Sequence, residues 1–130
     1  MTTELRYLAY TALLTAALWI PYVITQVRVN GFLKPPNYVD PTPRPLPPFG
    51  RRADRAHLNA VESFAPFAAL VLIAQVAGKT DASTAFLTMA FFWLRLAHAV
   101  VYWLGVPFVR TLIFTLGFAC VVGLGCAILR

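Results

Sequence analysis

Charged residues are scarce in this sequence, and acidic residues are the scarcest. Only 12% of its 130 residues are charged, with 11 Lys and Arg against 5 Asp and Glu, whereas soluble domains carry about 25%. Hydrophobic residues make up 59%, which excludes an ordinary soluble domain and predicts a one-domain membrane protein. The basic excess lies beside apolar runs, so we expect it to set membrane orientation and expect no nucleic-acid partner.

Cysteine is nearly absent as well. Cys120 and Cys126 stand six residues apart in an apolar run, with neither a CxxC motif nor the spacing of a metal site. We expect both to be packing residues, and we expect no metal site.

Long apolar runs dominate the remainder. Each has about the 20 residues that a membrane crossing needs, and together they predict an all-α, four-helix membrane bundle with spans at about 7–27, 56–78, 82–104 and 108–129. The first run is too long for the apolar part of a signal peptide, so we expect it to be retained, with a kink at Pro21.

Residues 28–55 form the one extended polar segment. Seven of its positions between 35 and 48 are proline, which favours extended, polyproline-like structure. This loop is either a stiff surface connection or a ligand for a proline-binding module.

Two polar stripes enter the predicted spans. Arg55, Asn59 and Glu62 stand at i, i+4 and i+7, and Arg95, His98 and Tyr102 stand at i, i+3 and i+7, so each set shares one helical face. Ionisable groups within a span are costly and usually face a protein interior or a wet cavity. The stripes therefore carry the first functional hypothesis.

The basic residues also predict an orientation. Four spans place both termini on one side, and the two connections opposite them hold most of the basic residues: Arg28, Lys34, Arg44, Arg51, Arg52, Arg55 and Arg110, against Arg6, Lys79 and Arg130 on the terminal side. The positive-inside rule places the richer side in the cytoplasm and both termini on the other side of the membrane. We expect this membrane to be a bacterial inner membrane or the endoplasmic reticulum. Glu62 and Arg95 then lie roughly 10–15 Å below the cytoplasmic boundary, and Arg110 opens the fourth span on that side.

These residues resemble a known family, the membrane-associated proteins in eicosanoid and glutathione metabolism (MAPEG). The matching pattern is Arg55-Ala-His-x-Asn59-x-x-Glu62 with Pro66-Phe67, then Arg95-x-x-His98-x-x-x-Tyr102, then an arginine near the start of the fourth span. The likeness covers nearly the whole chain. It departs from prostaglandin synthase-like members at Leu58, where those members have a basic residue.

The resemblance implies a homotrimer that holds glutathione between neighbouring subunits near the cytoplasmic face. In members that use glutathione, the residues matching Arg55, Asn59, Glu62 and Tyr102 contact the tripeptide. Arg110 is the candidate for stabilising its thiolate by charge, and Tyr102 is the candidate for doing so by a hydrogen bond. Arg52, Arg95 and His98 complete the set of expected glutathione contacts. The implied reaction is thiolate attack on a lipophilic electrophile dissolved in the bilayer.

Three alternatives stay open at this point. Glu62 and Arg95 could pair simply to join two helices. The same groove could bind a lipid or a partner protein without catalysis. The chain could also be a purely structural helical bundle.

Overall fold

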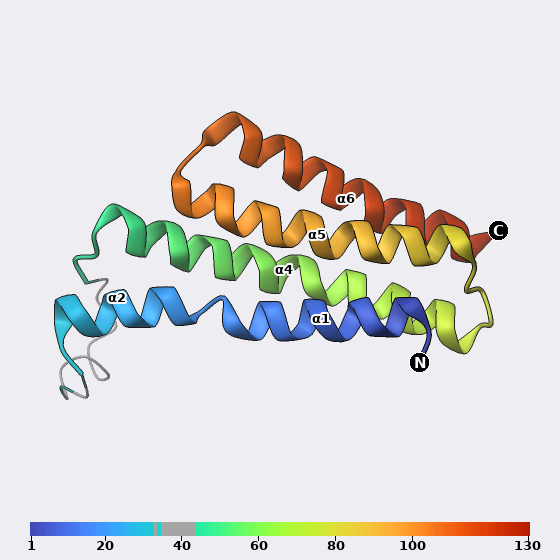
Figure 1. The fold of residues 1–130 in the computed structure, drawn as a ribbon, viewed down its shortest axis with the longest axis horizontal. Coiled ribbons are helices and arrows are strands. Elements are labelled where there is room, and N and C mark those ends of the chain that lie inside the picture. Colours follow the sequence, from blue (N-terminus) through green and yellow to red (C-terminus); the bar gives the residue numbers. More distant parts are fainter. Residues whose placement is uncertain (33, 35–43) are drawn as a thin grey trace.

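The protein is a bundle of helices aligned along one axis (Figure 1). The computed structural model describes residues 1–32, 34 and 44–130. Within these residues there is no strand, and the helices are α1 (Thr3–Ala17), α2 (Ile20–Asn30), α4 (Pro48–Val76), α5 (Ala82–Leu104) and α6 (Pro107–Leu129). Helices α1 and α2 follow each other nearly in line and together form one long segment (Figure 1).

Four segments are long and apolar enough to cross a membrane. They contain 28 residues for α1 and α2 together, 29 for α4, and 23 each for α5 and α6, and a crossing needs about 20. The all-α architecture with four candidate spans, predicted from the sequence, is confirmed.

Helix α4 begins earlier than the second predicted span. Its first residue is Pro48, a position that tolerates proline because the first N–H groups of a helix have no helical acceptor. Residues 48–55, assigned above to a loop, are therefore helical, as are residues 28–30 at the end of α2. Charged residues mark the end of the apolar run, but the helix continues through them. The two hypotheses about the proline-rich loop fall mainly on residues 35–43, outside the described part of the chain.

The first segment is interrupted next to Pro21, as expected. Helix α1 ends at Ala17 and α2 starts at Ile20, so the break itself lies at Leu18 and Trp19. Proline has no N–H to donate to the carbonyl four residues earlier, which here belongs to Ala17, and its ring crowds that carbonyl. The interruption therefore precedes the proline by two residues.

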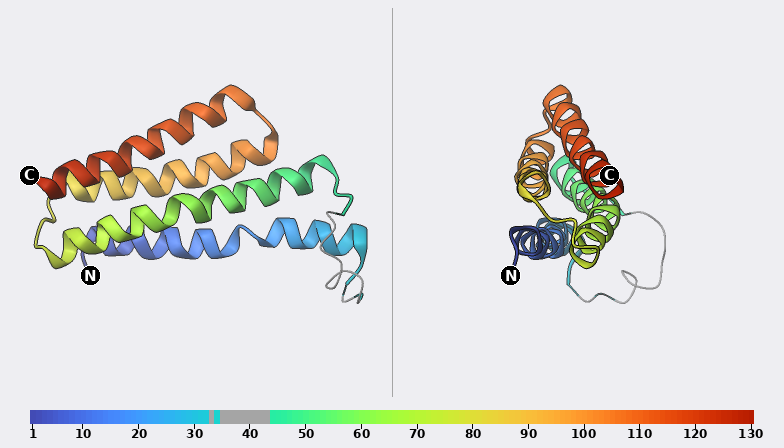
Figure 2. Two further views of the ribbon diagram at one scale, coloured as in Figure 1. Left: turned by 180° about the vertical axis from the view of Figure 1, so that it is seen from behind. Right: turned by 90° about the vertical axis from the view of Figure 1, so that its right-hand side faces the viewer.

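Helix α4 is the central element of the bundle, because it packs against α1, α2, α5 and α6. Where α4 meets α5, the rings of Phe67 and Phe91 stack with their centres 4.0 Å apart. The two chain ends and the turn before α5 lie at one end of the bundle, while the turn between α5 and α6 lies toward the other (Figures 1 and 2).

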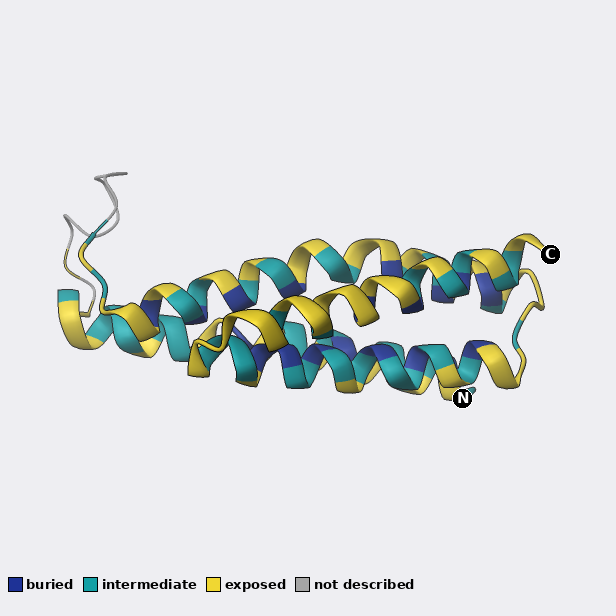
Figure 3. Ribbon diagram, turned by 90° about the horizontal axis from the view of Figure 1, so that it is seen from above, coloured by how far each residue is buried: buried dark blue, intermediate teal, exposed yellow. Residues whose placement is uncertain are grey.

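Exposed residues lie along the outer faces of the helices (Figure 3). Several are large and apolar, among them Phe86, Leu112 and Phe118, which are 60–61% exposed. Exposed apolar residues on so many helices indicate contact with lipid or with another subunit.

Candidate functional site

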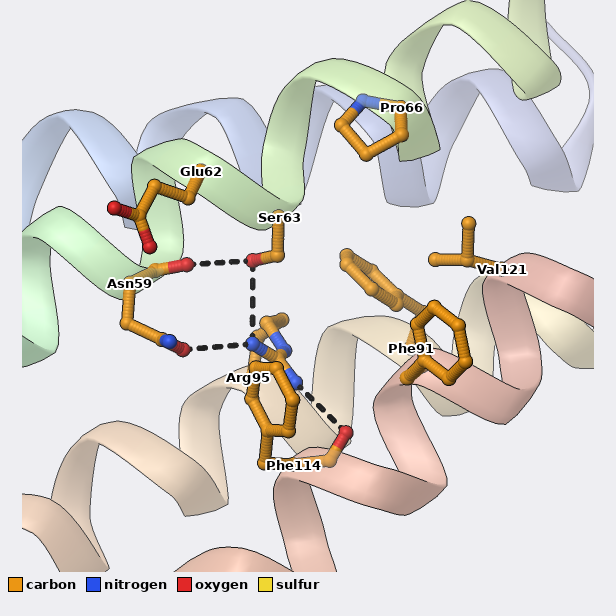
Figure 4. A pocket seen from close by; sticks show the side chains of 9 residues that line it. Asn59, Glu62, Ser63, Pro66, Phe91, Arg95, Phe114 and Val121 are labelled. Carbon is orange, nitrogen blue, oxygen red and sulfur yellow. Dashed lines mark hydrogen bonds between the residues drawn. The ribbon is translucent and has the colours of Figure 1, made fainter.

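Arg95 lies at the centre of the candidate site. It stands in the middle of α5 with only 4% of its surface exposed, and its guanidinium reaches both α4 and α6 (Figure 4). Nη1 donates hydrogen bonds to Asn59 Oδ1 and to Ser63 Oγ, each at 3.2 Å, and Nη2 donates to the Phe114 carbonyl at 3.5 Å. The ring centres of Phe91 and Phe114 lie 5.3 and 5.4 Å from Cζ, within cation–π range.

The hydrogen bonding of Arg95 is incomplete. A guanidinium has five N–H donors, whereas the described part of the chain gives Arg95 three bonds and no partner for its buried Nε. All three acceptors are neutral oxygens. Glu62 is exposed on α4 and is not among them, so the simple pairing of Glu62 with Arg95 is not what the structure contains. Arg95 is instead a buried cation with donors to spare, which suits an anionic ligand.

A cavity of about 240 Å³ lies beside Arg95, between α4, α5 and α6. We call it the deep cavity. Polar groups line one part of its wall and apolar side chains line the remainder (Figure 4). Its lining residues are Asn59, Glu62, Ser63, Pro66, Phe91, Arg95, Phe114, Phe118 and Val121.

A second cavity of about 210 Å³ adjoins the first, since Asn59 and Phe114 line both. We call it the outer cavity, because its other lining residues stand toward the α5–α6 turn. These residues are His98, Tyr102, Arg110 and Thr111.

The α5–α6 turn brings the charged group of the outer cavity into place. Gly105 ends α5 with φ +78°, a left-handed conformation that only glycine adopts readily, and Pro107 then opens α6. Arg110, in the first turn of α6, thereby stacks over Tyr102, with Cζ 4.6 Å from the ring centre. His98 meets the same ring edge to face, at 5.5 Å between centres.

The predicted site residues separate into three groups. The structure gathers Asn59, Glu62 and Arg95 around the deep cavity, and Asn59, His98, Tyr102 and Arg110 around the outer cavity. Arg52 and Arg55 line neither of these two cavities and lie nearer the start of α4. Arg55 is exposed. Arg52 donates from Nε to the Trp103 carbonyl at 2.9 Å, so it caps the C-terminus of α5.

Sequence analysis missed Ser63 and Phe114 as site residues. Ser63 follows Asn59 by four positions, so helical spacing alone could have extended the polar stripe to it. Phe114 contributes a backbone carbonyl and a ring face, and no sequence signal distinguishes it from the other aromatic residues of the chain.

Comparison with protein-family models gives a match to the MAPEG family over residues 7–130. A search of curated proteins found no match. The family match includes every residue that lines the deep and outer cavities, and it agrees with the four apolar helices that could cross a membrane. The chain is an integral membrane protein and belongs to the MAPEG family.

Proposed function

We propose that the protein binds glutathione within the membrane and conjugates it to lipophilic electrophiles. The MAPEG family includes glutathione transferases and proteins of eicosanoid synthesis. The observation that carries the proposal is the pair of adjoining cavities, with Glu62 and Arg95 in one and Arg110 in the other. Glutathione has two carboxylates, one ammonium and one thiol, and these residues supply charges that complement them.

The deep cavity is the proposed site for the γ-glutamyl end of glutathione. This end has an ammonium and a carboxylate on a single carbon atom, so their binding groups must face one space. Glu62 and Arg95 line the same cavity, and no oxygen of residues 1–32, 34 or 44–130 accepts from Arg95 Nε. We assign Glu62 and Asn59 to the ammonium and Arg95 to the carboxylate.

The glycine carboxylate is assigned to the basic residues toward the α5–α6 turn. Arg55 is exposed at the start of α4, and His98 lines the outer cavity. Arg52 is a weaker contact than the sequence suggested, because its Nε already bonds the Trp103 carbonyl and only its Nη groups remain for a ligand.

The outer cavity is the proposed site of the reacting sulfur. A thiol has a free pKa near 8.5, and a neighbouring cation lowers it. Arg110 supplies that cation, and the Tyr102 hydroxyl supplies a hydrogen bond. The thiol proton leaves to solvent, and the thiolate attacks an electrophilic carbon of the acceptor. A carbon–sulfur bond forms as the leaving group departs with its electron pair, without a covalent enzyme intermediate and without a metal.

Binding of a lipid or another lipophilic molecule without catalysis is the second candidate function. The apolar part of the deep cavity favours it, because Pro66, Phe91, Phe118 and Val121 offer no group for chemistry. Saturable binding of a lipophilic ligand with no thiolate formation would support this alternative over conjugation.

We further propose a homotrimer whose site faces the cytoplasm. Arg55 and Glu62 are exposed on α4, and polar groups at membrane depth need a protein partner or a wet cavity, which a neighbouring subunit would provide. Basic residues gather at the end of the bundle that holds the outer cavity, which supports a cytoplasmic position for this end and a non-cytoplasmic position for the termini.

Glutathione titration of the purified protein in lipid discs tests the proposed function. We expect saturable binding, and we expect Glu62→Gln to raise the Kd about 10- to 100-fold, because the ligand ammonium loses its charged acceptor in a poorly hydrated site. Asp54→Asn is the matched control, since it neutralises a carboxylate on the same helix that lines neither cavity. Absence of saturable binding to the unaltered protein would rule the proposal out.

A further inference from the structure

Gly117 stands in the middle of α6 and is buried. Glycine is among the least favourable residues for a helix interior, so its presence needs a local reason. A Cβ at this position would overlap Arg95 Nη2 and would lie 3.2 Å from both Cζ and Nε of the same side chain. The space that a side chain at 117 would fill is therefore occupied by the Arg95 guanidinium.

The space beside Gly117 determines the orientation of the Arg95 guanidinium. Nη1 is held on one side by Asn59 and Ser63 of α4. Nη2 reaches the Phe114 carbonyl of α6, which it can do because α6 presents no side chain at Gly117. The group is thus fixed between the two helices at the wall of the deep cavity, with Nε unpaired.

We propose that Gly117 is a positioning residue that makes the site selective for glutathione. By leaving room for the guanidinium against α6, it aims Arg95 at the carboxylate of the γ-glutamyl residue. Thiols that lack this carboxylate gain nothing from the arrangement. The role of Gly117 rests on the glutathione site proposed above and adds the residue that sets its discrimination between thiols.

The other glycines of α6 face apolar leucine side chains and not a charged group. A Cβ at Gly125 would approach only Leu70 Cδ1, at 4.0 Å, and a Cβ at Gly123 would meet the tip of Leu87 at 3.2 Å. At Gly117 the atom that must yield is the far end of a flexible side chain rather than backbone. Alanine at 117 should therefore preserve the bundle and displace the guanidinium.

Two ligands and two variants test this role. The ligands are glutathione and 4-aminobutyryl-cysteinylglycine, which keeps the amine and the thiol but lacks the γ-glutamyl carboxylate. In calorimetric titrations in lipid discs, we expect Gly117→Ala to raise the Kd of glutathione about tenfold or more, because a charge-assisted contact is lost. The Kd of the analogue should change by less than about twofold. Gly125→Ala, the matched control, should leave both values unchanged.

A double-mutant cycle separates positioning from packing. Arg95→Lys keeps the charge but lacks the planar fork, so it should by itself reduce the preference for glutathione over the analogue. In that background, Gly117→Ala should add little further loss, because the guanidinium it would displace is absent. If Gly117→Ala does not assemble, the test is the ratio of the two Kd values in the Arg95→Lys variant, which should show a reduced preference for glutathione.

The outcomes distinguish this role from the proposed function. Equal weakening of both ligands by Gly117→Ala, or no weakening of either, would mean that Gly117 only packs helices and would overturn the positioning role. An Arg95→Lys variant that keeps the full preference for glutathione would overturn it too. Failure of the unaltered protein to bind glutathione would overturn the proposed function and this role together. Normal binding by the unaltered protein, with both ligands affected equally by Gly117→Ala, would overturn the role of Gly117 alone.

Discussion

Arg95 is a cation in a membrane-spanning part of the chain, where an unpaired charge is expensive. Carbonyl, amide and hydroxyl oxygens and two aromatic faces surround it, and they stabilise the charge in part. A carboxylate bonded to it would complete that stabilisation but would also fill the place of an anionic ligand. Because Glu62 stays exposed on the wall of the same cavity, both charges remain available. The candidate site therefore presents both charges to the same cavity.

Helical spacing predicted that Asn59, Glu62 and Arg95 would lie close together, and all three line the deep cavity. Their depth below the cytoplasmic boundary stays a prediction. Spacing could not predict the partners of Arg95, because these depend on rotamers and on which helices are neighbours. The Phe114 carbonyl and the space at Gly117 are properties of α6 that become visible only once α5 and α6 are packed together.

Arg110 should act on the sulfur and not on the binding of the peptide. We expect Arg110→Ala to leave the Kd of glutathione nearly unchanged and to reduce the bound thiolate roughly ten- to a hundredfold, the equivalent of about 1.5–3 kcal/mol for a charge-assisted contact. Arg110→Lys should restore part of the loss, since charge survives while the fork geometry does not. The thiolate ultraviolet band near neutral pH measures this directly.

Arg28→Ala serves as the control for Arg110, because it removes an exposed arginine in the last turn of α2 that lines neither cavity. An unchanged thiolate band in Arg110→Ala would reduce Arg110 to an interfacial anchor. Tyr102, whose ring Arg110 covers, would then be the next candidate for activating the thiol.

At the scale of elements, helix ends were harder to predict than helix existence. The second apolar run was predicted to begin at about residue 56, where charge gives way to apolar sequence, yet α4 continues back to Pro48. Arginine and alanine are good helix formers, so the segment around Arg51 and Arg52 extends the helix beyond the apolar run. This extension matters for helix packing, because it brings Arg52 to the C-terminus of α5.

A buried hydrogen bond, which the sequence did not predict, joins helix α1 to α5. Glu4 is 4% exposed and Thr84 is fully buried, and Thr84 Oγ1 donates to Glu4 Oε1 at 2.7 Å. The same threonine completes the N-cap of α5, because its Oγ1 accepts from the Asp81 N–H at 2.8 Å. Removing one partner of a buried polar pair leaves the other unsatisfied, which costs about 1–3 kcal/mol.

Thr84→Val should therefore destabilise the bundle by about 1–3 kcal/mol, with a fall of several degrees in melting temperature measured in detergent. Thr115→Val is the control, because this threonine is exposed and its hydroxyl bonds only the carbonyl of Thr111 in its own helix. Equal stability of the two variants would show that the Glu4 contact does not hold α1 in place.

At the scale of the whole molecule, the number of apolar segments and their connections followed from composition and run length. An even number of spans places the chain ends together, and the structure has this arrangement (Figure 1). The sequence did not predict that the polar residues would be divided between two adjoining cavities. Asn59 of α4 and Phe114 of α6 line both cavities, and they come together only when α4 packs against α6. Packing between helices that are distant in the sequence was the missing information.

Orientation in the membrane is the whole-molecule property on which a cytoplasmic site depends. Single cysteines can report it in a background where Cys120 and Cys126 are replaced by alanine. Pro45 lies before α4 and Ser83 lies in the first turn of α5, and both are exposed at opposite ends of the bundle. In intact bacterial cells that carry the protein in their inner membrane, we expect an impermeant thiol reagent to label Ser83→Cys and to spare Pro45→Cys until the membrane is permeabilised.

The charge distribution supplies the physical reason for that expectation. Basic residues flank the Pro45 end of the bundle at Arg28, Arg51, Arg52 and Arg110, whereas Lys79 is the basic residue of the turn before α5, and basic connections are retained in the cytoplasm. Labelling of Pro45→Cys with protection of Ser83→Cys would reverse the orientation. The outer cavity would then open away from the cytoplasm, and its proposed glutathione would have to come from the other compartment.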